Sequence, residues 1–217
     1  MVDSSELDTS PSQYGVNSII DHDVWYDIQN AIGDNNIDFH RGNTQISENQ
    51  NEQSDIRKCS VGWINSDNNQ KLFDSLFKLI NEYNNGSSNW NVDILGLEPL
   101  QYTIYNGDVD DEGEYYSWHF DTSPQPSKYD WHQSKLIRKI SMTIFLNDPD
   151  DYEGGELDIE TVGPDFKRKG RENRYDTFKL PKGSILLFPS NKWHRVRTVT
   201  SGIRESLVGW FVGPPYK

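Results

Sequence analysis

The stretch YYSWHFDTS, residues 115–123, places a histidine and an aspartate two positions apart in a run whose aromatic residues favour a β-strand. Because side chains at i and i+2 of a strand project to the same face, His119 and Asp121 point the same way and can chelate one metal ion. The structural alternative is that Asp121 begins a turn while His119 is a half-buried strand residue. An isolated His-x-Asp pair favours that alternative, so other residues must decide.

A second histidine lies in the stretch FPSNKWHRVRTVTSGIRESLVGWFV. We expect His194 at the start of one strand and Arg204 on the next, with a hairpin turn at 200–202 that brings the two strands side by side. His194, His119 and Asp121 offer two imidazoles and one carboxylate, the ligand set of non-haem Fe(II) oxygenases, which leaves coordination positions open. A zinc hydrolase can also use two histidines and one carboxylate, so these ligands alone leave that alternative open.

Arg204 and Ser206 share one strand face by the same period of two. A guanidinium can hold a carboxylate through two parallel hydrogen bonds and a neighbouring hydroxyl can add a third, so the pair suits the distal carboxylate of a dicarboxylic acid. Alone, Arg204 would be a solvated side chain on a surface strand. Joined to the three candidate ligands, the pair favours an oxygenase. A zinc hydrolase has no evident need for it, and a non-catalytic jelly-roll binding protein needs no aligned ligand set.

The elements that must position these residues are mostly short strands. Strand-like runs separated by Gly, Pro, Asp and Asn predict strands at about 99–105, 115–120, 138–146, 155–160, 175–180, 184–188, 194–199 and 203–212. Eight successive strands predict a mainly β fold, a jelly roll or double-stranded β-helix of two facing sheets. Before them we expect a strand at 59–65 and helices at about 21–32 and 67–84, capped by Asp21 and Asp67, that buttress one sheet.

The 217-residue chain has a formal net charge of -13 and a single cysteine, Cys59. The acidic charge argues against binding to nucleic acid or to an anionic membrane, and it is more compatible with a basic partner. One cysteine excludes an internal disulfide, and the sequence shows neither a signal-peptide pattern nor a membrane-spanning run, so we expect a cytoplasmic protein. We expect residues 1–17 to be a flexible segment and residues 18–217 to form one domain. The oligomeric state is not determined by the sequence.

Four sequence motifs follow one another along the chain: HFD (119–121), FLNDPDDYEGGELDIE (145–160), PKGSILLFPSNKWHRV (181–196) and GIRES (202–206). In this order they closely resemble Fe(II)/2-oxoglutarate-dependent dioxygenases of the prolyl 4-hydroxylase-like superfamily, and most of all the microbial PKHD-type hydroxylases. The resemblance covers about residues 57–213 and implies a double-stranded β-helix, in agreement with the strand pattern.

The same resemblance implies Fe(II), with 2-oxoglutarate and O2 as co-substrates and ascorbate as a further candidate cofactor. It implies hydroxylation of a C–H bond with release of succinate and CO2, and a prolyl residue of a protein is the expected target. An oxygenase of this class acting on a small molecule or on another residue type is the alternative. A nucleic-acid dealkylase shares the chemistry but fits an acidic chain poorly.

By the resemblance, His119, Asp121 and His194 match the iron ligands, and Arg204 matches the basic residue that pairs with the C5 carboxylate of 2-oxoglutarate. Tyr105 matches a tyrosine that hydrogen-bonds to 2-oxoglutarate.

Ser206 and Thr143 are further candidate contacts of the co-substrate. Some relatives carry a second tyrosine for the same carboxylate where this chain has Phe145, so one hydrogen bond of the pocket is absent or replaced. For the two glycines of EGGEL (153–157) we expect a structural role, since they permit an unusual backbone conformation before a strand.

Substrate contacts are expected on the two sides of the His-x-Asp motif. Arg138 matches an arginine that helps to hold the target peptide in relatives. Aromatic walls for a proline ring could come from Tyr116, Trp118 and Trp131. Acidic residues on the loop before the motif could attract a basic, proline-containing segment, although a solvated acidic face is the alternative: Asp108, Asp110, Asp111, Glu112 and Glu114.

Overall fold

The computed structural model of the protein describes residues 14–17, 20–33, 37–42, 56–86, 90–108, 112–122, 135–161 and 174–216. These residues form two α-helices, α1 (His22–Gly33) and α2 (Gln70–Asn85), and short 3-10 helices at Ser66–Asn68 and Pro149–Asp151. They also form thirteen strands: β1 (Gly15–Asn17), β2 (His40–Arg41), β3 (Arg57–Lys58), β4 (Ser60–Ile64), β5 (Gly96–Leu97), β6 (Leu100–Asn106), β7 (Glu114–His119), β8 (Ile137–Phe145), β9 (Tyr152–Gly154), β10 (Leu157–Glu160), β11 (Tyr175–Phe178), β12 (Ile185–Pro189) and β13 (His194–Gly213).

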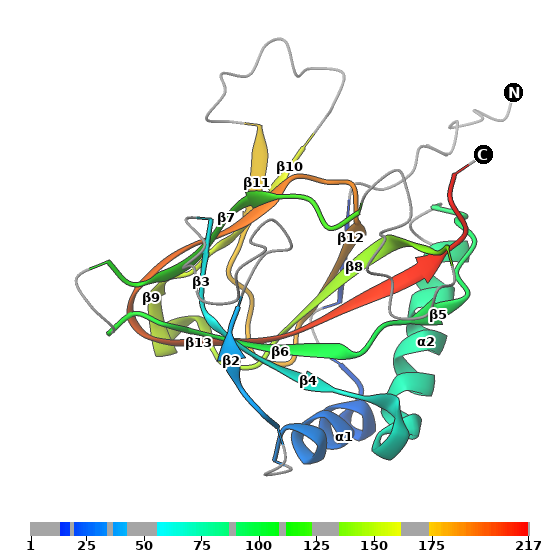
Figure 1. Cartoon of the computed structure of the whole chain (residues 1–217), viewed down its shortest axis with the longest axis horizontal. Helices are drawn as coiled ribbons and strands as arrows, with labels where there is room; N and C mark the ends of the chain where they lie inside the picture. The colour runs from blue at the N-terminus through cyan, green and yellow to red at the C-terminus, as the bar shows by residue number, and fades with distance from the viewer. Residues whose placement is uncertain are drawn as a thin grey trace, which may run out of the picture.

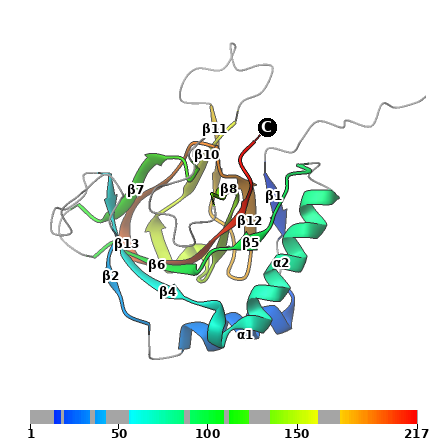
Figure 2. The same cartoon turned by 45° about the vertical axis from the view of Figure 1, so that its right-hand side comes forward.

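The strands form two facing antiparallel sheets that share β13. The larger sheet has the order β1-β12-β8-β13-β6-β4-β2, and β5 also pairs with β13. The smaller sheet contains β3, β7, β10, β11 and the first half of β13, with β9 beside its corner. Figure 2 shows the strands curving around a central interior, with both helices outside on one side. The predicted mainly β, double-stranded β-helix fold with a helical buttress is confirmed.

β13 is one continuous strand of 20 residues, so the expectation of a hairpin at 200–202 is wrong. The first half pairs with β7 and β10 in the smaller sheet, and the second half pairs with β6 and β8 in the larger sheet. The strand passes the corner between the sheets at Gly202, whose φ of 72° favours glycine. Because β13 wraps around the interior (Figure 1), His194 and Arg204 both face inward without lying opposite each other.

The helices pack on the outer face of the larger sheet and form one of two hydrophobic cores with it. The second core lies between the sheets and includes inward-facing residues of both. Asp21 caps α1 as predicted, since its Oδ1 accepts a hydrogen bond from the backbone N–H of Asp23 at 2.9 Å. Asp67 instead lies in the 3-10 turn, and Asn69 is the N-cap residue of α2.

The first described residues belong to the sheet. β1 pairs with β12, so the flexible segment expected over 1–17 does not extend to Gly15–Asn17. Backbone hydrogen bonds to a sheet edge stabilise these residues despite their low hydrophobicity. Residues 1–13 lie outside the described residues, and a single domain over 18–217 stays a prediction. In the described parts of the chain, neither helix has the length and apolar character needed to cross a bilayer.

Candidate functional site

Three side chains from separate places in the sequence converge between the sheets. His119 ends β7, Asp121 follows it closely, and His194 begins β13 directly opposite His119. His194 Nε2 lies 3.4 Å from Asp121 Oδ2, and His119 Nε2 lies 3.8 Å from Asp121 Oδ1. One ligand atom of each residue lies within 4.8 Å of the others, and no second such group of His, Cys, Asp or Glu occurs among the described residues.

Backbone carbonyls set the orientation of both imidazoles. His119 Nδ1 lies 2.8 Å from the carbonyl oxygen of Ser117, and His194 Nδ1 lies 3.0 Å from that of Lys192. A carbonyl only accepts hydrogen bonds, so each Nδ1 carries the proton and each Nε2 keeps a free lone pair. Both Nε2 atoms therefore offer their lone pairs on the side where the Asp121 carboxylate lies, as metal ligands require.

Ser141 holds the Asp121 carboxylate and Ser190 holds the Asp121 backbone, and the sequence analysis singled out neither serine. Ser141 Oγ donates to Asp121 Oδ2 at 2.6 Å and lies 2.9 Å from Ser190 Oγ. The backbone N–H of Asp121 donates to the carbonyl oxygen of Ser190 at 2.9 Å. Ser190 stands four positions before His194 in the quoted FPSNKWH motif, but nothing in the sequence links Ser141 to Asp121. These contacts fix the carboxylate between the imidazoles.

The local electrostatics keep His119 and Asp121 in the forms that bind a metal. Burial lowers the pKa of His119 to about 3, and the neighbouring His194 adds to the effect. The His119 imidazole is therefore neutral near pH 7. Burial opposes ionisation of Asp121, but His194 and His119 outweigh it and lower the pKa of the carboxyl to about 2. Two imidazole nitrogens and one carboxylate form a set that suits Fe(II).

Arg204 is a buried cation without a counter-ion in the described part of the chain. Its side chain is 1% exposed, and its Nη1 donates to Ser206 Oγ at 3.1 Å. Its Nε and Nη2 have no hydrogen-bond partner, and no described carboxylate pairs with it. Burying such a charge is costly unless an anion compensates it. The free donor edge matches the geometry of a carboxylate.

Aromatic rings from three strands surround the Arg204 guanidinium. Its Cζ lies 5.4 Å from the ring centroid of Tyr105 on β6 and 5.6 Å from that of Phe145 on β8. Burial raises the pKa of the Tyr105 phenol, so the hydroxyl stays protonated and can donate. Tyr152 on β9 is the third ring, and the sequence analysis did not select it although it lies in a quoted motif. Thr143 is buried on the inner face of β8 as predicted.

The two aromatic candidates on β7 lie on opposite faces of the strand. A register shift in the pairing of β7 with β13 marks a bulge, which places Tyr116 on the same face as His119 with the rings stacked at 3.5 Å. The ring of Trp118 packs against Tyr175 at 5.7 Å and under the guanidinium of Arg195 at 4.9 Å. The structure therefore brings Tyr116 to the candidate metal ligands but does not bring Trp118 there.

Arg57 on β3 is an inward-facing cation that the sequence analysis missed. It is 8% exposed, and its Cζ lies 4.6 Å from the ring centroid of Tyr116. Its Nη2 donates to Gln101 Oε1 at 2.7 Å and its Nε to Cys59 Sγ at 3.0 Å, and within the described ranges it has no carboxylate partner. A two-residue strand carries too short a pattern to reveal such a residue.

Arg138 lies on β8, within electrostatic reach of the Asp121 carboxylate, and helps to lower its pKa. Its Nη2 donates to Glu98 Oε2 at 2.7 Å, and its Nε lies 3.0 Å from the same oxygen. Its Cζ lies 3.7 Å from the ring centroid of Trp210, which in turn lies 6.2 Å from Trp63. The candidate peptide-binding arginine is thus held in place by an ion pair and a ring.

Asp108 and Glu114, two acidic residues near the start of β7, make contacts away from the candidate metal ligands. Glu114 is 3% exposed, forms an ion pair with Arg41 and accepts a hydrogen bond from the backbone N–H of Asn106 at 2.8 Å. Asp108 Oδ1 lies 3.4 Å from the backbone N–H of Gly202, at the corner of β13. Both residues therefore lie towards the end of β7 that is opposite the candidate metal ligands.

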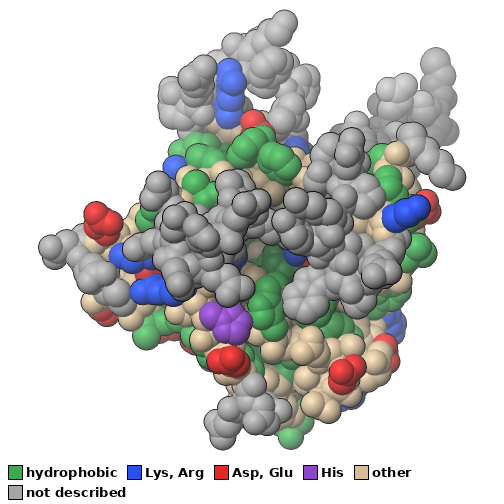
Figure 3. Space-filling model, viewed as in Figure 1, with side chains coloured by type: hydrophobic (Ala, Val, Ile, Leu, Met, Phe, Trp, Pro, Cys, Tyr) green, Lys and Arg blue, Asp and Glu red, His purple; other side chains and the backbone are tan. Residues whose placement is uncertain are grey.

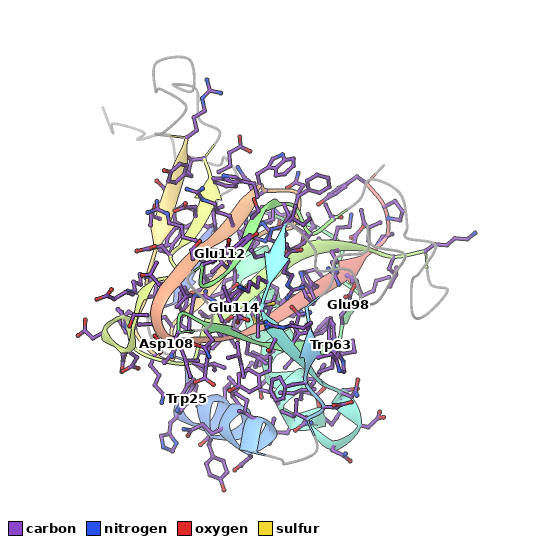
Figure 4. All side chains as sticks on the ribbon, turned by 60° about the vertical axis from the view of Figure 1, so that its left-hand side comes forward. Trp25, Trp63, Glu98, Asp108, Glu112 and Glu114 are labelled. Carbon is purple, nitrogen blue, oxygen red and sulfur yellow. The ribbon has the colours of Figure 1, made fainter. Side chains whose placement is uncertain are left out.

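Figure 4 shows where three acidic residues of this part of the chain lie relative to Trp63. Asp108, Glu112 and Glu114 lie on one side of the view, and Glu98 and Trp63 lie on the other. Asp108 and Glu114 therefore give no support to an acidic entrance beside the ligands, and for Glu112 that hypothesis stays a prediction. The remaining residues of that hypothesis lie outside the described residues: Asp110, Asp111 and Trp131.

Two exposed aromatic residues flank the histidines in sequence. Phe120 follows His119 and is 46% exposed, and Trp193 precedes His194 and is 43% exposed. Their rings meet edge to face with centroids 5.0 Å apart. On the face shown in Figure 3, hydrophobic side chains also gather around the base of the β10–β11 hairpin. Exposed apolar surface of this kind favours binding of a partner.

Comparison with known proteins connects this geometry to a family. The sequence model of the 2OG-Fe(II) oxygenase superfamily matches residues 100–212, which hold all three candidate metal ligands and Arg204. A PKHD-type hydroxylase of Hyphomonas neptunium is 43% identical over 99 residues, covering 46% of this chain and 38% of the relative. One of Prochlorococcus marinus is 39% identical over 99 residues, covering 46% and 37%. The match thus spans less than two fifths of these relatives' length.

Solved structures resemble the whole fold. A Pseudomonas putida prolyl-4-hydroxylase has a TM-score of 0.59 at 16% identity, covering 92% of each chain. A Trichoplax adhaerens prolyl hydroxylase, solved with a peptide fragment of the hypoxia inducible factor oxygen degradation domain, has a TM-score of 0.63 at 18% identity, covering 92% of this chain and 83% of that one. At these identities the likeness shows a shared fold.

Proposed function

Because the chain belongs to the 2OG-Fe(II) oxygenase superfamily, we propose that it is an Fe(II)- and 2-oxoglutarate-dependent dioxygenase that hydroxylates a prolyl residue of a protein substrate. Succinate and CO2 are the other products. Cytoplasmic location, the absence of nucleic-acid and membrane partners, and a role for ascorbate stay predictions.

The observation that carries the proposal is the state of Arg204. A guanidinium that is 1% exposed, with Nε and Nη2 unpaired, needs an anion. The distal carboxylate of 2-oxoglutarate supplies one. Ser206, bonded to Arg204, and Tyr105, whose ring lies 5.4 Å from Arg204 Cζ, are the proposed sources of further hydrogen bonds. A hydrolytic zinc site has no use for this pocket, so Arg204 favours the oxygenase over the hydrolase.

The residues of the chain have separate roles in this proposal. His119, Asp121 and His194 would hold Fe(II) through two nitrogens and one carboxylate oxygen, and Ser141 keeps the carboxylate in place. When bound, the iron supplies the reaction with O2 that couples oxidative decarboxylation of 2-oxoglutarate to hydroxylation. Phe188 packs edge to face on His194 at 4.8 Å and helps to exclude water from the ligands.

Aromatic surfaces near the ligands support a prolyl substrate. Tyr116 stacks on His119, and Trp210 with Trp63 forms a second apolar wall beside Arg138. A proline ring buries well against such rings, since it has no backbone N–H to satisfy. The solved neighbours described as prolyl hydroxylases, one of them with a bound peptide, support the same substrate class. Asp108 and Glu114 give no support to a preference for basic segments.

A small carboxylic acid is the second candidate substrate, and Arg57 favours it. This buried guanidinium contacts only neutral groups among the described residues, and it lies against the Tyr116 ring that stacks on His119. A substrate carboxylate would compensate its charge. In a peptide substrate, backbone carbonyl oxygens would accept hydrogen bonds from the same group.

The proposal is tested by incubating purified protein with Fe(II), 2-oxoglutarate and 18O2, once with a proteome extract and once with its small-molecule fraction. Succinate formation with a peptide 18 Da heavier at proline supports the prolyl proposal. A labelled small acid without a labelled peptide would replace it by the second candidate. The His194→Ala variant is the control, since it removes a proposed iron ligand and should leave both fractions unlabelled.

A further inference from the structure

A second unpaired polar group lies beside Arg204 between the two sheets. Tyr152 is 4% exposed, and its hydroxyl has no hydrogen-bond partner. A Cβ atom on Gly155 would lie 2.9 Å from Arg204 Cδ and 3.0 Å from Tyr152 Cε2, so the two side chains flank one point. A buried hydroxyl without a partner is costly, as is a buried guanidinium with unpaired N–H groups. One ligand that accepts hydrogen bonds from both would remove both costs.

The fold holds the Tyr152 ring in this place from a strand outside the larger sheet. β9 pairs with β13 at its corner, where Tyr152 lies opposite Gly202. Lys179 Nζ donates to the carbonyl oxygen of Tyr152 at 2.8 Å and lies 4.4 Å from its ring centroid. Glycine is required at position 155, where φ is 67° and a side chain would collide with both Arg204 and Tyr152. The ring is therefore positioned by backbone pairing and by a cation.

The hydroxyl is available as a donor. Burial raises the pKa of Tyr152, and the nearby Arg204 guanidinium only partly opposes this rise, so the phenol stays protonated. Arg204 has donors only, whereas a carboxylate has two oxygens that can each accept more than one hydrogen bond. Phe145, the ring on β8 at 5.6 Å from Arg204 Cζ, contributes no polar atom.

We propose that Tyr152 is a co-substrate-binding residue, whose hydroxyl donates a hydrogen bond to the same carboxylate of 2-oxoglutarate that Arg204 holds. The inference rests on the proposed function. It assigns to β9 the hydrogen bond that Phe145 cannot make from β8. The structural alternative is that Tyr152 only fills the core between the sheets, with its hydroxyl near the guanidinium and no role in binding.

The test is the affinity of Tyr152→Phe for 2-oxoglutarate, measured by calorimetry on Mn(II)-loaded protein without O2. Losing one hydrogen bond to a charged group should weaken binding about 10- to 100-fold. The urea midpoint of the cofactor-free variant should not fall, because the ring stays and only an unpaired hydroxyl leaves. Tyr102→Phe is the matched control. Its hydroxyl bonds to Glu205, and Tyr102 belongs to the core on the helix side of the larger sheet, so the 2-oxoglutarate affinity should be unchanged.

Tyr152→Phe affinity within twofold of the wild type would overturn the assignment of Tyr152 and leave the proposed function intact. An equal loss of affinity in Tyr102→Phe would also overturn it, because the effect would then be general. If the wild-type protein with Mn(II) bound no 2-oxoglutarate, the proposed function itself would be refuted.

Discussion

Replacement of Arg204 by methionine should act in opposite directions on the cofactor-free protein and on its 2-oxoglutarate complex. In the cofactor-free protein, the variant removes a buried charge whose Nε and Nη2 have no partner, which is worth about 3 kcal/mol. The variant also loses the hydrogen bond to Ser206, which is worth about 1 kcal/mol. Loss of the contacts with the Tyr105 and Phe145 rings costs about 1 kcal/mol more for the two rings together. The free energy of unfolding should therefore rise by about 1 kcal/mol.

Binding of 2-oxoglutarate should reverse the order of stability of the wild type and Arg204→Met. Two hydrogen bonds from a guanidinium to a carboxylate are worth about 3 to 6 kcal/mol, so the affinity of Arg204→Met should fall by a factor of about 100 or more. At a 2-oxoglutarate concentration 100 times its dissociation constant, the wild type gains about 2.7 kcal/mol of stability, while the variant gains little. The wild type then becomes the more stable protein.

The assay is urea unfolding of both proteins with Mn(II), with and without 2-oxoglutarate. Arg197→Met is the matched control, since Arg197 lies on the same strand but pairs with Asp158 at 2.9 Å outside the pocket. It should lose stability in both conditions and keep the full effect of the ligand. The reasoning fails if Arg204→Met is less stable than the wild type without ligand and gains as much from 2-oxoglutarate.

Three further substitutions test the parts around this pocket. His194→Ala should lose tight binding of a divalent metal, because only two protein ligands remain. Equilibrium dialysis with Mn(II) measures this, and unchanged affinity would exclude His194 as a metal ligand. Ser141→Ala should weaken metal affinity about 10-fold by freeing the Asp121 carboxylate, measured in the same way, and an equal affinity would make that hydrogen bond incidental. Gly155→Ala should lower the urea midpoint and weaken 2-oxoglutarate binding, because its Cβ would lie 2.9 Å from Arg204 Cδ at a φ of 67°; a change in neither would refute the tight packing.

Local pattern was sufficient for much of the fold and for the identity of the candidate ligands. The strands near 100, 137, 175, 185 and 194 were predictable because alternation and turn residues are properties of neighbouring positions. The spacing of His119 and Asp121, with His194 far along the chain, was enough to suggest one metal site. Glycine at 154 and 155 was correctly assigned to backbone geometry, with φ values of 71° and 67°.

Errors arose where a strand departs from regular geometry. Regular alternation cannot reveal the bulge in β7, which puts Tyr116 beside His119 and turns Trp118 to the other face. The Thr-Ser-Gly run at 200–202 has the composition of a hairpin turn, yet β13 continues through it. Pairing with β9 and β6 on either side of Gly202 is long-range, so composition alone could not decide between a turn and a corner.

By itself, the sequence determined which groups are present: two imidazoles, a carboxylate and an arginine on strands of a β-rich, acidic chain. Only the tertiary structure decided that Arg204 has no counter-ion among the described residues and that the Tyr152 hydroxyl lies unpaired beside it. Whether a buried donor is satisfied depends on every element that closes around it, here β6, β8, β9 and β13. Those contacts join residues far apart in the chain, and no local pattern encodes the register that brings them together.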